Sequence, residues 1–392
     1  MALFFTLVER IAVNCVRLRF NAKTQRGRGA GKSLTESHTE THHRKMQTYF
    51  HHEEHEGHEG LNERSELNFF SSWLKFLFLG LLLCSCPSEA QTNEQRTLVL
   101  VVGAPGEPEY AEAFSNWAGL WVQAATQGDM QVRVVGLDAN GSTSATNDLT
   151  RLLNLLTEET ARPAGELWLV FIGHGTYDGR EAKFNLRGPD LSAEDLAAVL
   201  KRCRRPLVVV QCASASGPFL PALSAPGRVI ITATRSGYEV NFARFGGYLA
   251  RALADPAADL DHDGQVSLLE AFLMAARQTD EFYRDEGRLM TEHVLLDDNG
   301  DGLGTPPEWF RGVRAVKTPE KGKSADGVRA HQMILTRGQS EQELRPEARA
   351  RRDELEQQLS VLRSKKPELK EDDYYSQLEK ILTEMATLYP EK

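Results

Sequence analysis

A histidine and a cysteine follow two apolar stretches of the chain, and these residue types can perform nucleophilic catalysis together. His174 comes just after the run 167–172, and Cys212 just after the run 207–210. A thiolate is the reactive form of cysteine, and a nearby imidazole can take its proton and return it to a leaving amine. The amides of Gly175 and Cys212 could donate to the oxyanion of such a reaction. The pair predicts acyl transfer, with Cys212 as nucleophile and His174 as base.

The two apolar stretches predict neighbouring strands of a parallel sheet. Neither run alternates with polar residues, which is typical of strands buried on both faces. Residues 191–201 between them have helical spacing, with Ser192 placed to cap the first turn. A strand–helix–strand unit makes the strands parallel, and ligands of open α/β sheets bind beyond the carboxyl ends of the strands. We therefore expect His174 and Cys212 to lie side by side at one edge.

Further apolar runs extend this sheet and complete an α/β fold. Listed by residue number, strands are expected over 96–103, 131–136 and 228–234, and helices over 107–127, 147–160, 242–254 and 268–286. The strands lie between helices along the chain, which favours a mostly parallel sheet with helices on its faces.

The order of these motifs resembles the caspase and legumain group (clan CD) of cysteine peptidases. A strand ends in His-Gly, a crossover follows, and the next strand ends in Cys212 and small residues. Residues 212–216 are similar to the legumain pattern Cys-x-Ser-Gly-Ser, with Ala215 in place of Gly and Gln211 in place of the usual Ala before the Cys. The resemblance spans residues 97–255.

This resemblance implies a caspase/legumain-like three-layer αβα sandwich and a cysteine-type endopeptidase acting on a peptide or protein substrate. It also implies that the loop 235–239 lines the substrate pocket, which makes Arg235 and Glu239 candidate substrate-binding residues. A serine nucleophile is not favoured, because the Gly-x-Ser-x-Gly pattern fails around Ser214.

A structural role for the same residues is the alternative. Cysteine often packs as a small buried hydrophobe, and a histidine at a strand end often hydrogen-bonds within the core. In that case the chain would be a catalytically inactive calcium-binding module or a scaffold on a caspase-like fold.

Two Asp-rich segments fit the EF-hand pattern of oxygen ligands around a turn glycine. Because hard oxygen ligands at this spacing suit Ca²⁺, we predict that Ca²⁺ is a cofactor that orders this part of the chain and takes no part in chemistry. The candidate ligands in the first loop are Asp259, Asp261, Asp263, Gln265, Ser267 and Glu270, and in the second Asp297, Asn299, Asp301, Leu303 and Glu308.

Composition and the ends of the chain set the remaining expectations. A formal net charge of −9 over 392 residues argues against a nucleic-acid partner. Residues 1–68 are predicted to form no folded domain, and the true start could lie at Met46 or later; the His-Glu tract 51–59 could also bind metal by composition. Residues 69–90 combine a short apolar run with a small-residue cleavage site, which indicates a secretory signal.

Export therefore places the protein in the periplasm, outside the cell or on a lipid anchor, and the membrane is contacted only through that signal or lipid. Residues 83–86 also resemble a lipobox, which would place a lipid on Cys86. After the α/β domain, 96–255, we expect a calcium segment, 256–312, and a linker, 313–342. The charged tail, 343–392, has leucines at helical spacing, predicts two helices broken at Pro367, and could bind a partner.

Overall fold

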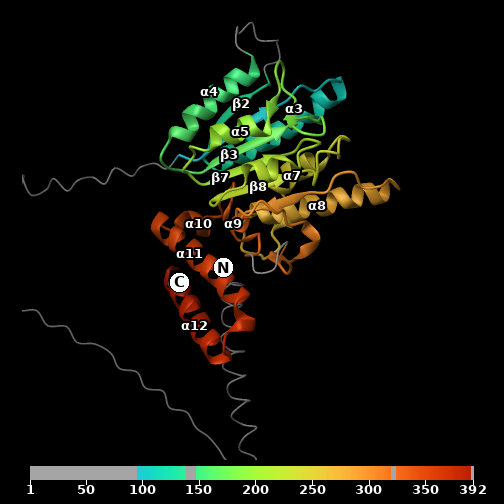
Figure 1. The fold of residues 1–392 in the computed structure, drawn as a ribbon. Coiled ribbons are helices and arrows are strands. Elements are labelled where there is room, and N and C mark those ends of the chain that lie inside the picture. Colours follow the sequence, from blue (N-terminus) through green and yellow to red (C-terminus); the bar gives the residue numbers. More distant parts are fainter. Residues whose placement is uncertain (1–94, 138–146, 319–323, 390–392) are drawn as a thin grey trace, which may run out of the picture. The chain divides into compact units, whose positions relative to one another are not determined.

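The computed structural model describes residues 95–137, 147–318 and 324–389, and a six-stranded sheet lies at the centre of this part of the chain (Figure 1). The strand order is β2-β1-β3-β7-β8-β9; the first five strands are parallel, and β9 is antiparallel to β8. The predicted α/β class with a mostly parallel sheet is confirmed. The strands are β1 (Thr97–Val102), β2 (Gln131–Val135), β3 (Leu167–Ile172), β7 (Leu207–Gln211), β8 (Arg228–Thr232) and β9 (Leu295–Asp297).

Helices cover both faces of the sheet and form a three-layer sandwich. Successive strand side chains point to opposite faces, so alternate residues of each strand enter two separate apolar cores. Every residue of β1 and β3 is buried, as the uninterrupted apolar runs predicted. One face packs against α3 (Pro108–Gln127), α7 (Phe245–Ala252) and α8 (Leu268–Asp285), and the other against α4 (Asp148–Ala161), α5 (Ala193–Leu200) and α6 (Phe219–Leu223).

Helices α4 and α5 begin with side-chain N-caps. Ser192 is the N-cap of α5 and its hydroxyl accepts a hydrogen bond from the Asp195 amide at 3.0 Å, as the sequence predicts. Asn147 caps α4 in the same way through the Thr150 amide at 2.9 Å. These bonds satisfy backbone donors that the first helical turn leaves without partners.

A buried ion pair fixes the amino end of the sheet. The side chains of Arg205 and Glu159 are both fully buried, with Nη1 and Oε2 3.1 Å apart. The same guanidinium donates to the carbonyl oxygens of Gly165, Gln95 and Glu166 at 2.7 to 3.0 Å. Burial lowers the pKa of Arg205, and Glu159 opposes that effect. Arg205 therefore ties the chain before β1 and β3 to the start of β7.

A small antiparallel sheet that the sequence did not predict follows His174. It consists of β4 (Gly175–Tyr177), β5 (Ala182–Phe184) and β6 (Leu191–Ser192) in that order. Strands of two or three residues are too short to show a period in the sequence. The Asn185 amide donates to the His174 carbonyl at 3.0 Å, so this sheet also holds the backbone of His174.

The chain beyond α8 forms short elements and a helical hairpin. Helices α11 and α12 pack against each other (Figure 1), and Pro367 lies in the turn η3 between them. Among the described residues, no helix is both long and apolar enough to span a bilayer. The remaining elements are η1 (Pro256–Ala258), η2 (Pro307–Trp309), β10 (Phe310–Arg311), β11 (Arg314–Ala315), α9 (Val328–Gln332), α10 (Gln339–Glu343), α11 (Pro346–Ser364), η3 (Lys366–Glu368) and α12 (Glu371–Thr387).

Candidate functional site

The sheet brings His174 and Cys212 to the same carboxyl edge. Strands β3 and β7 are parallel neighbours, and their last paired residues are Phe171 and Gln211. His174 follows Phe171 along the chain, and Cys212 follows Gln211. The Cys212 amide still belongs to the ladder, because it donates to the Phe171 carbonyl at 3.0 Å. The alternation of β7 continues through Cys212, whose side chain enters the core formed with α3, α7 and α8.

The Cys212 thiol is enclosed by α7. Only 1% of the residue is exposed. A Cβ atom built at Gly246 of α7 would lie 2.5 Å from the Cys212 Cβ and 3.0 Å from its Sγ, so the thiol packs directly against the helix backbone. Burial, with a smaller contribution from the charge of Glu292, raises the pKa of Cys212 to about 12. In this conformation Cys212 is therefore a neutral thiol rather than a nucleophilic thiolate.

His174 is held in an aromatic cluster on the same side of the sheet. Its ring centroid lies 4.8 Å from that of Tyr110, 5.2 Å from that of Phe114 and 5.9 Å from that of Phe242. Its Nε2 is 3.1 Å from the Pro105 carbonyl oxygen. Because a carbonyl only accepts, Nε2 carries the hydrogen in this bond, and Nδ1 is the acceptor in the neutral ring.

The two amides expected to bind an oxyanion are already hydrogen-bonded. The Gly175 amide donates to Ser214 Oγ at 3.2 Å, and that hydroxyl donates to the Gly175 carbonyl at 3.1 Å. The Cys212 amide is bound to Phe171. Neither donor is free in this conformation, and the oxyanion role of Gly175 and Cys212 stays a prediction. Ala215 has φ +54°, the left-handed conformation that favours the glycine of the legumain pattern.

Glu239 and Arg235 bind each other and a histidine that the sequence did not indicate. Glu239 Oε2 accepts from the Arg235 amide at 2.9 Å, and Oε1 lies 3.3 Å from Arg235 Nε and 2.6 Å from His293 Nδ1. His293 follows Glu239 by 54 residues, so no local motif could pair them. The Glu239 carboxylate thus orients two side chains of the protein itself. Of the two predicted substrate-binding residues, Arg235 is the more accessible, because 61% of its side chain is exposed.

Gln211 buries an amide without hydrogen bonds. The residue is fully buried on the opposite face of the sheet from Cys212, at the level of Phe171 and Thr232. Neither its Oε1 nor its Nε2 has a partner within the described residues. An unpaired buried amide costs about 1–3 kcal/mol, so this position lowers the free energy of unfolding.

The first Asp-rich loop gathers three carboxylates. Oxygens of Asp259, Asp261 and Asp263 lie within 4.8 Å of one another. Asp259 folds the loop by accepting the amides of Asp263 at 3.1 Å and Gly264 at 3.0 Å, and Gly264 makes the sharp turn with φ +91°. Burial first, and then the neighbouring charges of Asp261 and Glu270, raises the pKa of Asp263 to about 6. A cation at this point would remove that repulsion.

Glu270 joins this loop to α8. Its Oε2 accepts from the Ser267 amide at 2.9 Å and completes a capping box with the Ser267 hydroxyl, while Oε1 accepts from the Leu260 amide at 2.8 Å. Gln265 also bonds inside the loop, because its Nε2 donates to Asp263 Oδ2 at 3.0 Å.

His331 is a neighbour of this loop that the sequence did not reveal. It comes from α9, and its Nε2 lies 3.1 Å from Asp261 Oδ2. His331, Asp261 and Glu270 form a second group of candidate ligand atoms within 4.8 Å of one another. The Asp261 carboxylate raises the pKa of His331 against the effect of its burial, which lowers it.

The second Asp-rich loop repeats the fold of the first. Asp297 accepts the amides of Gly300 at 2.9 Å and Gly302 at 3.1 Å, and Asn299 Oδ1 accepts the Asp301 amide at 2.9 Å. Oδ2 of Asp301 is buried and has no hydrogen-bond partner among the described residues. That orphaned oxygen fits a cation held by Asp297, Asn299 and Asp301, with Leu303 at the position predicted to offer its carbonyl.

Glu308 lies apart from the carboxylates of the second loop in the structure described. The chain leaves this loop through Pro306 and Pro307 into η2, and Glu308 is exposed. Within the described ranges, its carboxylate does not join those of Asp297 and Asp301 in a group within 4.8 Å. Two prolines and η2 stand where the EF-hand pattern has the helix that carries the closing carboxylate, and a ligand role for Glu308 stays a prediction.

Asp326 supports this loop from a distant segment. Its Oδ1 accepts the amides of Asp298 at 3.0 Å and Asn299 at 3.1 Å, and its Oδ2 accepts the Thr305 hydroxyl at 2.5 Å. Burial and the neighbouring charge of Asp298 raise the pKa of Asp326 to about 8. Asp298 in turn accepts the amides of Gly327 at 2.9 Å and Ala330 at 2.8 Å.

No protein-family model matches the chain, and no curated protein matches it. Among solved structures, the Drosophila initiator caspase Dronc is similar, with 12% identity and a TM-score of 0.37 over 55% of this chain and 84% of that one. Caspase-1 from Spodoptera frugiperda is similar, with 9% identity and a TM-score of 0.35 over 53% of this chain and 87% of that one. One fold hosts many functions, so function has to be argued from the residues themselves.

We expect Cys212 to resist alkylation in the folded protein. A pKa of about 12 instead of 9.0 reduces the thiolate fraction at pH 8 by roughly 1,000-fold, and α7 blocks access to the sulfur. Iodoacetamide labelling mapped by mass spectrometry would show Cys212 reacting at the rate of global unfolding. If Cys212 were labelled as fast in the folded protein as in the urea-unfolded protein, the thiol would not be buried and neutral as described.

We expect Gln211→Met to raise the free energy of unfolding by about 1 kcal/mol, since it removes an unpaired buried amide and keeps a similar volume. Gln131→Met is the matched control. The Gln131 side chain accepts a hydrogen bond from Arg162 at 3.0 Å, so this change should be neutral or destabilising. Urea unfolding of both variants provides the measurement. If Gln211→Met is destabilised more than Gln131→Met, the prediction is wrong and the Gln211 amide has a hydrogen-bond partner.

Proposed function

We propose that this protein is a calcium-binding α/β module, with Ca²⁺ in the first Asp-rich loop and a second ion in the loop that contains Asp301. The observation that carries the proposal is the group of three carboxylates from Asp259, Asp261 and Asp263, whose oxygens lie within 4.8 Å of one another. Ca²⁺ prefers six to eight oxygen ligands and tolerates irregular geometry. In the first loop Gln265 and Ser267 would complete the set, and Glu270 would add its carboxylate if it gave up part of its hydrogen bonding.

A bound cation would neutralise the clustered carboxylates and hold the two loops in place. Helix α8 starts at the first loop, because Ser267 of that loop is its N-cap and Glu270 completes the capping box. Helix α9 contacts both loops, through His331 at Asp261 and through the amides of Gly327 and Ala330 at Asp298. Ion binding should therefore stabilise the packing of α8 and α9 together, which is a structural function for the metal.

Cysteine peptidase activity is the second candidate function. What favours it is that His174 and Cys212 leave neighbouring strands at the same edge and the same side of the sheet. Acyl transfer to Cys212 would require α7 to move away from the thiol, because Gly246 lies against Sγ. Its substrate would be a peptide or protein. We rank it below calcium binding because the thiol is neutral and both oxyanion amides are occupied.

Two further proposals concern location and partners. Export remains a prediction, since the signal segment 69–90 and Cys86 lie outside the described residues. In the tail, the hydrophobic side chains of Leu355, Leu359 and Leu362 are buried in the structure described. A partner of the tail would therefore bind its exposed charged faces rather than this apolar stripe.

We expect Ca²⁺ to raise the melting temperature of the purified protein. A free concentration one hundred times the Kd adds about 2.7 kcal/mol to the free energy of unfolding. Asp261→Asn with Asp263→Asn should remove most of the shift, because it deletes two of the three clustered charges. Asp280→Asn, on α8 outside the loops, is the control and should keep the shift. Calorimetry giving the same melting temperature in calcium and in chelator would refute calcium binding.

We expect an electrophilic peptide probe to leave the folded protein unlabelled in calcium, since the thiol is buried and neutral. The measurement is intact mass after incubation with an acyloxymethyl ketone peptide. Cys212→Ala and His174→Ala serve as controls. Labelling that both changes abolish would overturn the ranking and establish the peptidase.

A further inference from the structure

The first turn of α7 controls access to the Cys212 thiol. An added Cβ atom at Gly246 would lie 3.0 Å from the Cys212 Sγ, and one at Gly247 would lie 2.5 Å from the Trp117 ring. Both positions therefore approach their neighbours so closely that a side chain has no room there. While this turn stays in place, a reagent or a substrate cannot reach the sulfur, because only 1% of Cys212 is exposed.

Helix α7 is weak by itself. It is eight residues long and begins with Phe245, Gly246 and Gly247. Isolated helices of fewer than about 12 residues are marginal in water, and glycine inside a helix is unfavourable. Its N-cap residue is Arg244, whose side chain carries only donors and so cannot accept a hydrogen bond from the amides of the first turn. The start of the helix therefore depends on an acceptor from elsewhere.

Glu292 supplies that acceptor from a distant part of the chain. Its Oε2 accepts hydrogen bonds from the amides of Arg244 at 2.8 Å and Phe245 at 3.0 Å. Glu292 lies between α8 and β9, is fully buried, and follows Arg244 by 48 positions. A negative charge at the N-terminal end of a helix also interacts favourably with the helix dipole. Glu292 therefore caps α7 from outside the helix.

The contact between Glu292 and α7 should be made or lost as a unit. Burial raises the pKa of Glu292, and its hydrogen bonds with the amides of Phe245 and Arg244 lower it. A buried carboxylate without such bonds is strongly unfavourable, and the two amides would be left without an acceptor as well. The carboxylate and the first turn of α7 therefore stabilise each other's position.

His293, the next residue, holds the chain that follows Cys212. Its amide donates to Glu239 Oε2 at 3.2 Å, and its Nδ1 lies 2.6 Å from Glu239 Oε1. The Glu239 carbonyl in turn accepts the Ala215 amide at 2.8 Å. Two adjacent residues thus hold both the helix that covers the thiol and the loop that follows it.

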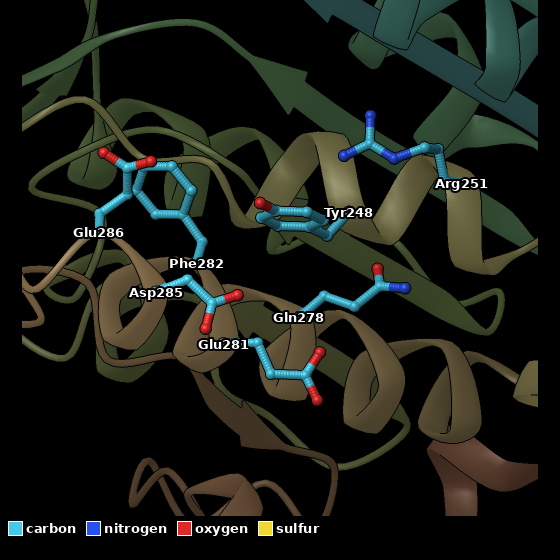
Figure 2. A pocket seen from close by; sticks show the side chains of 7 residues that line it. All are labelled: Tyr248, Arg251, Gln278, Glu281, Phe282, Asp285 and Glu286. Atoms are coloured by element: carbon cyan, nitrogen blue, oxygen red, sulfur yellow. The ribbon is translucent and has the colours of Figure 1, made fainter.

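The first turn of α7 has space on one side. A hollow with a volume of about 390 Å³ lies between α7 and the last turns of α8 (Figure 2). The side chains that line it come from α7 on one side and from α8 on the other, and they include Tyr248 and Phe282. The Arg244 guanidinium lies 4.3 Å from the Phe282 ring centroid. The hollow therefore borders the residues that begin α7, which leaves space for that turn to shift.

We propose that Glu292 is a latch that holds the first turn of α7 closed over Cys212, and that loss of this contact opens the turn while the rest of the fold stays intact. Glu292 is thus a positioning residue. Phe245 is fully buried, with its ring centroid 6.0 Å from that of Phe272, so the closed state is the dominant one. The proposal concerns access to the thiol of the second candidate function, and labelling of that thiol tests it without any peptide hydrolysis.

Glu292→Leu tests the latch, because it removes both acceptor oxygens and keeps an apolar side chain in the space. The full chain is labelled with iodoacetamide at urea concentrations below the unfolding transition, and mass spectrometry after digestion measures Cys212 separately. We expect labelling roughly tenfold or more above the rate that the variant's own global unfolding allows, with little dependence on urea, because a local opening exposes little surface. Labelling of Glu292→Leu that only follows its global unfolding would overturn the proposal.

Three further variants complete the experiment. Asn147→Ala is the matched control, since it deletes the N-cap bond of α4 on the opposite face of the sheet, and its labelling should follow global unfolding. Glu292→Gln keeps an acceptor oxygen for the two amides and should restore slow labelling. Glu292→Asp, one methylene shorter, replaces Glu292→Leu if that variant does not fold. Equal labelling of Glu292→Leu and Asn147→Ala, or of Glu292→Leu and Glu292→Gln, each relative to global unfolding, would contradict the proposal.

Discussion

Burial of parallel strands on both faces is the constraint on which this structure depends. Side chains of β1 and β3 enter two cores alternately, and no position along them is exposed to solvent. In β7 the same alternation continues past the apolar run. Cys212 takes the phase of Val210 and packs below α7, and Gln211 takes the opposite phase, where the apolar core offers its amide no partner. One geometric rule therefore explains the neutral thiol and the unpaired amide together.

Much of the fold could be predicted because its signals are local. Uninterrupted apolar runs located the central strands, and the Ser192 cap marked a helix start. The side of the sheet on which Cys212 would lie was also implicit in the period of β7. The sequence did not show that α7 covers the Cys212 thiol, because the close approach of Gly246 follows from tertiary packing.

The distant residues that contact the predicted site residues share one property. His293, Asp326 and His331 each contact a predicted residue from 27 to 70 positions away. Residues so distant in sequence leave no spacing pattern in a single chain. The candidate ligands of the two loops could be proposed from the sequence because their pattern is confined to twelve positions. For Glu308 the pattern assumes an exiting helix, and Pro306 and Pro307 lead into η2 instead.

The contacts of Asp298 and Asp326 have a consequence for the order of folding. Each carboxylate accepts backbone amides from the other's segment, so neither segment satisfies its buried donors alone. Loop-closure entropy must be spent before such non-local bonds form. A nascent chain that ends before residue 326 already contains all residues of the Asp297–Asp301 turn. It lacks the Asp326 carboxylate that accepts the backbone amides of this turn. The second loop should therefore be among the last parts of the molecule to become ordered during synthesis.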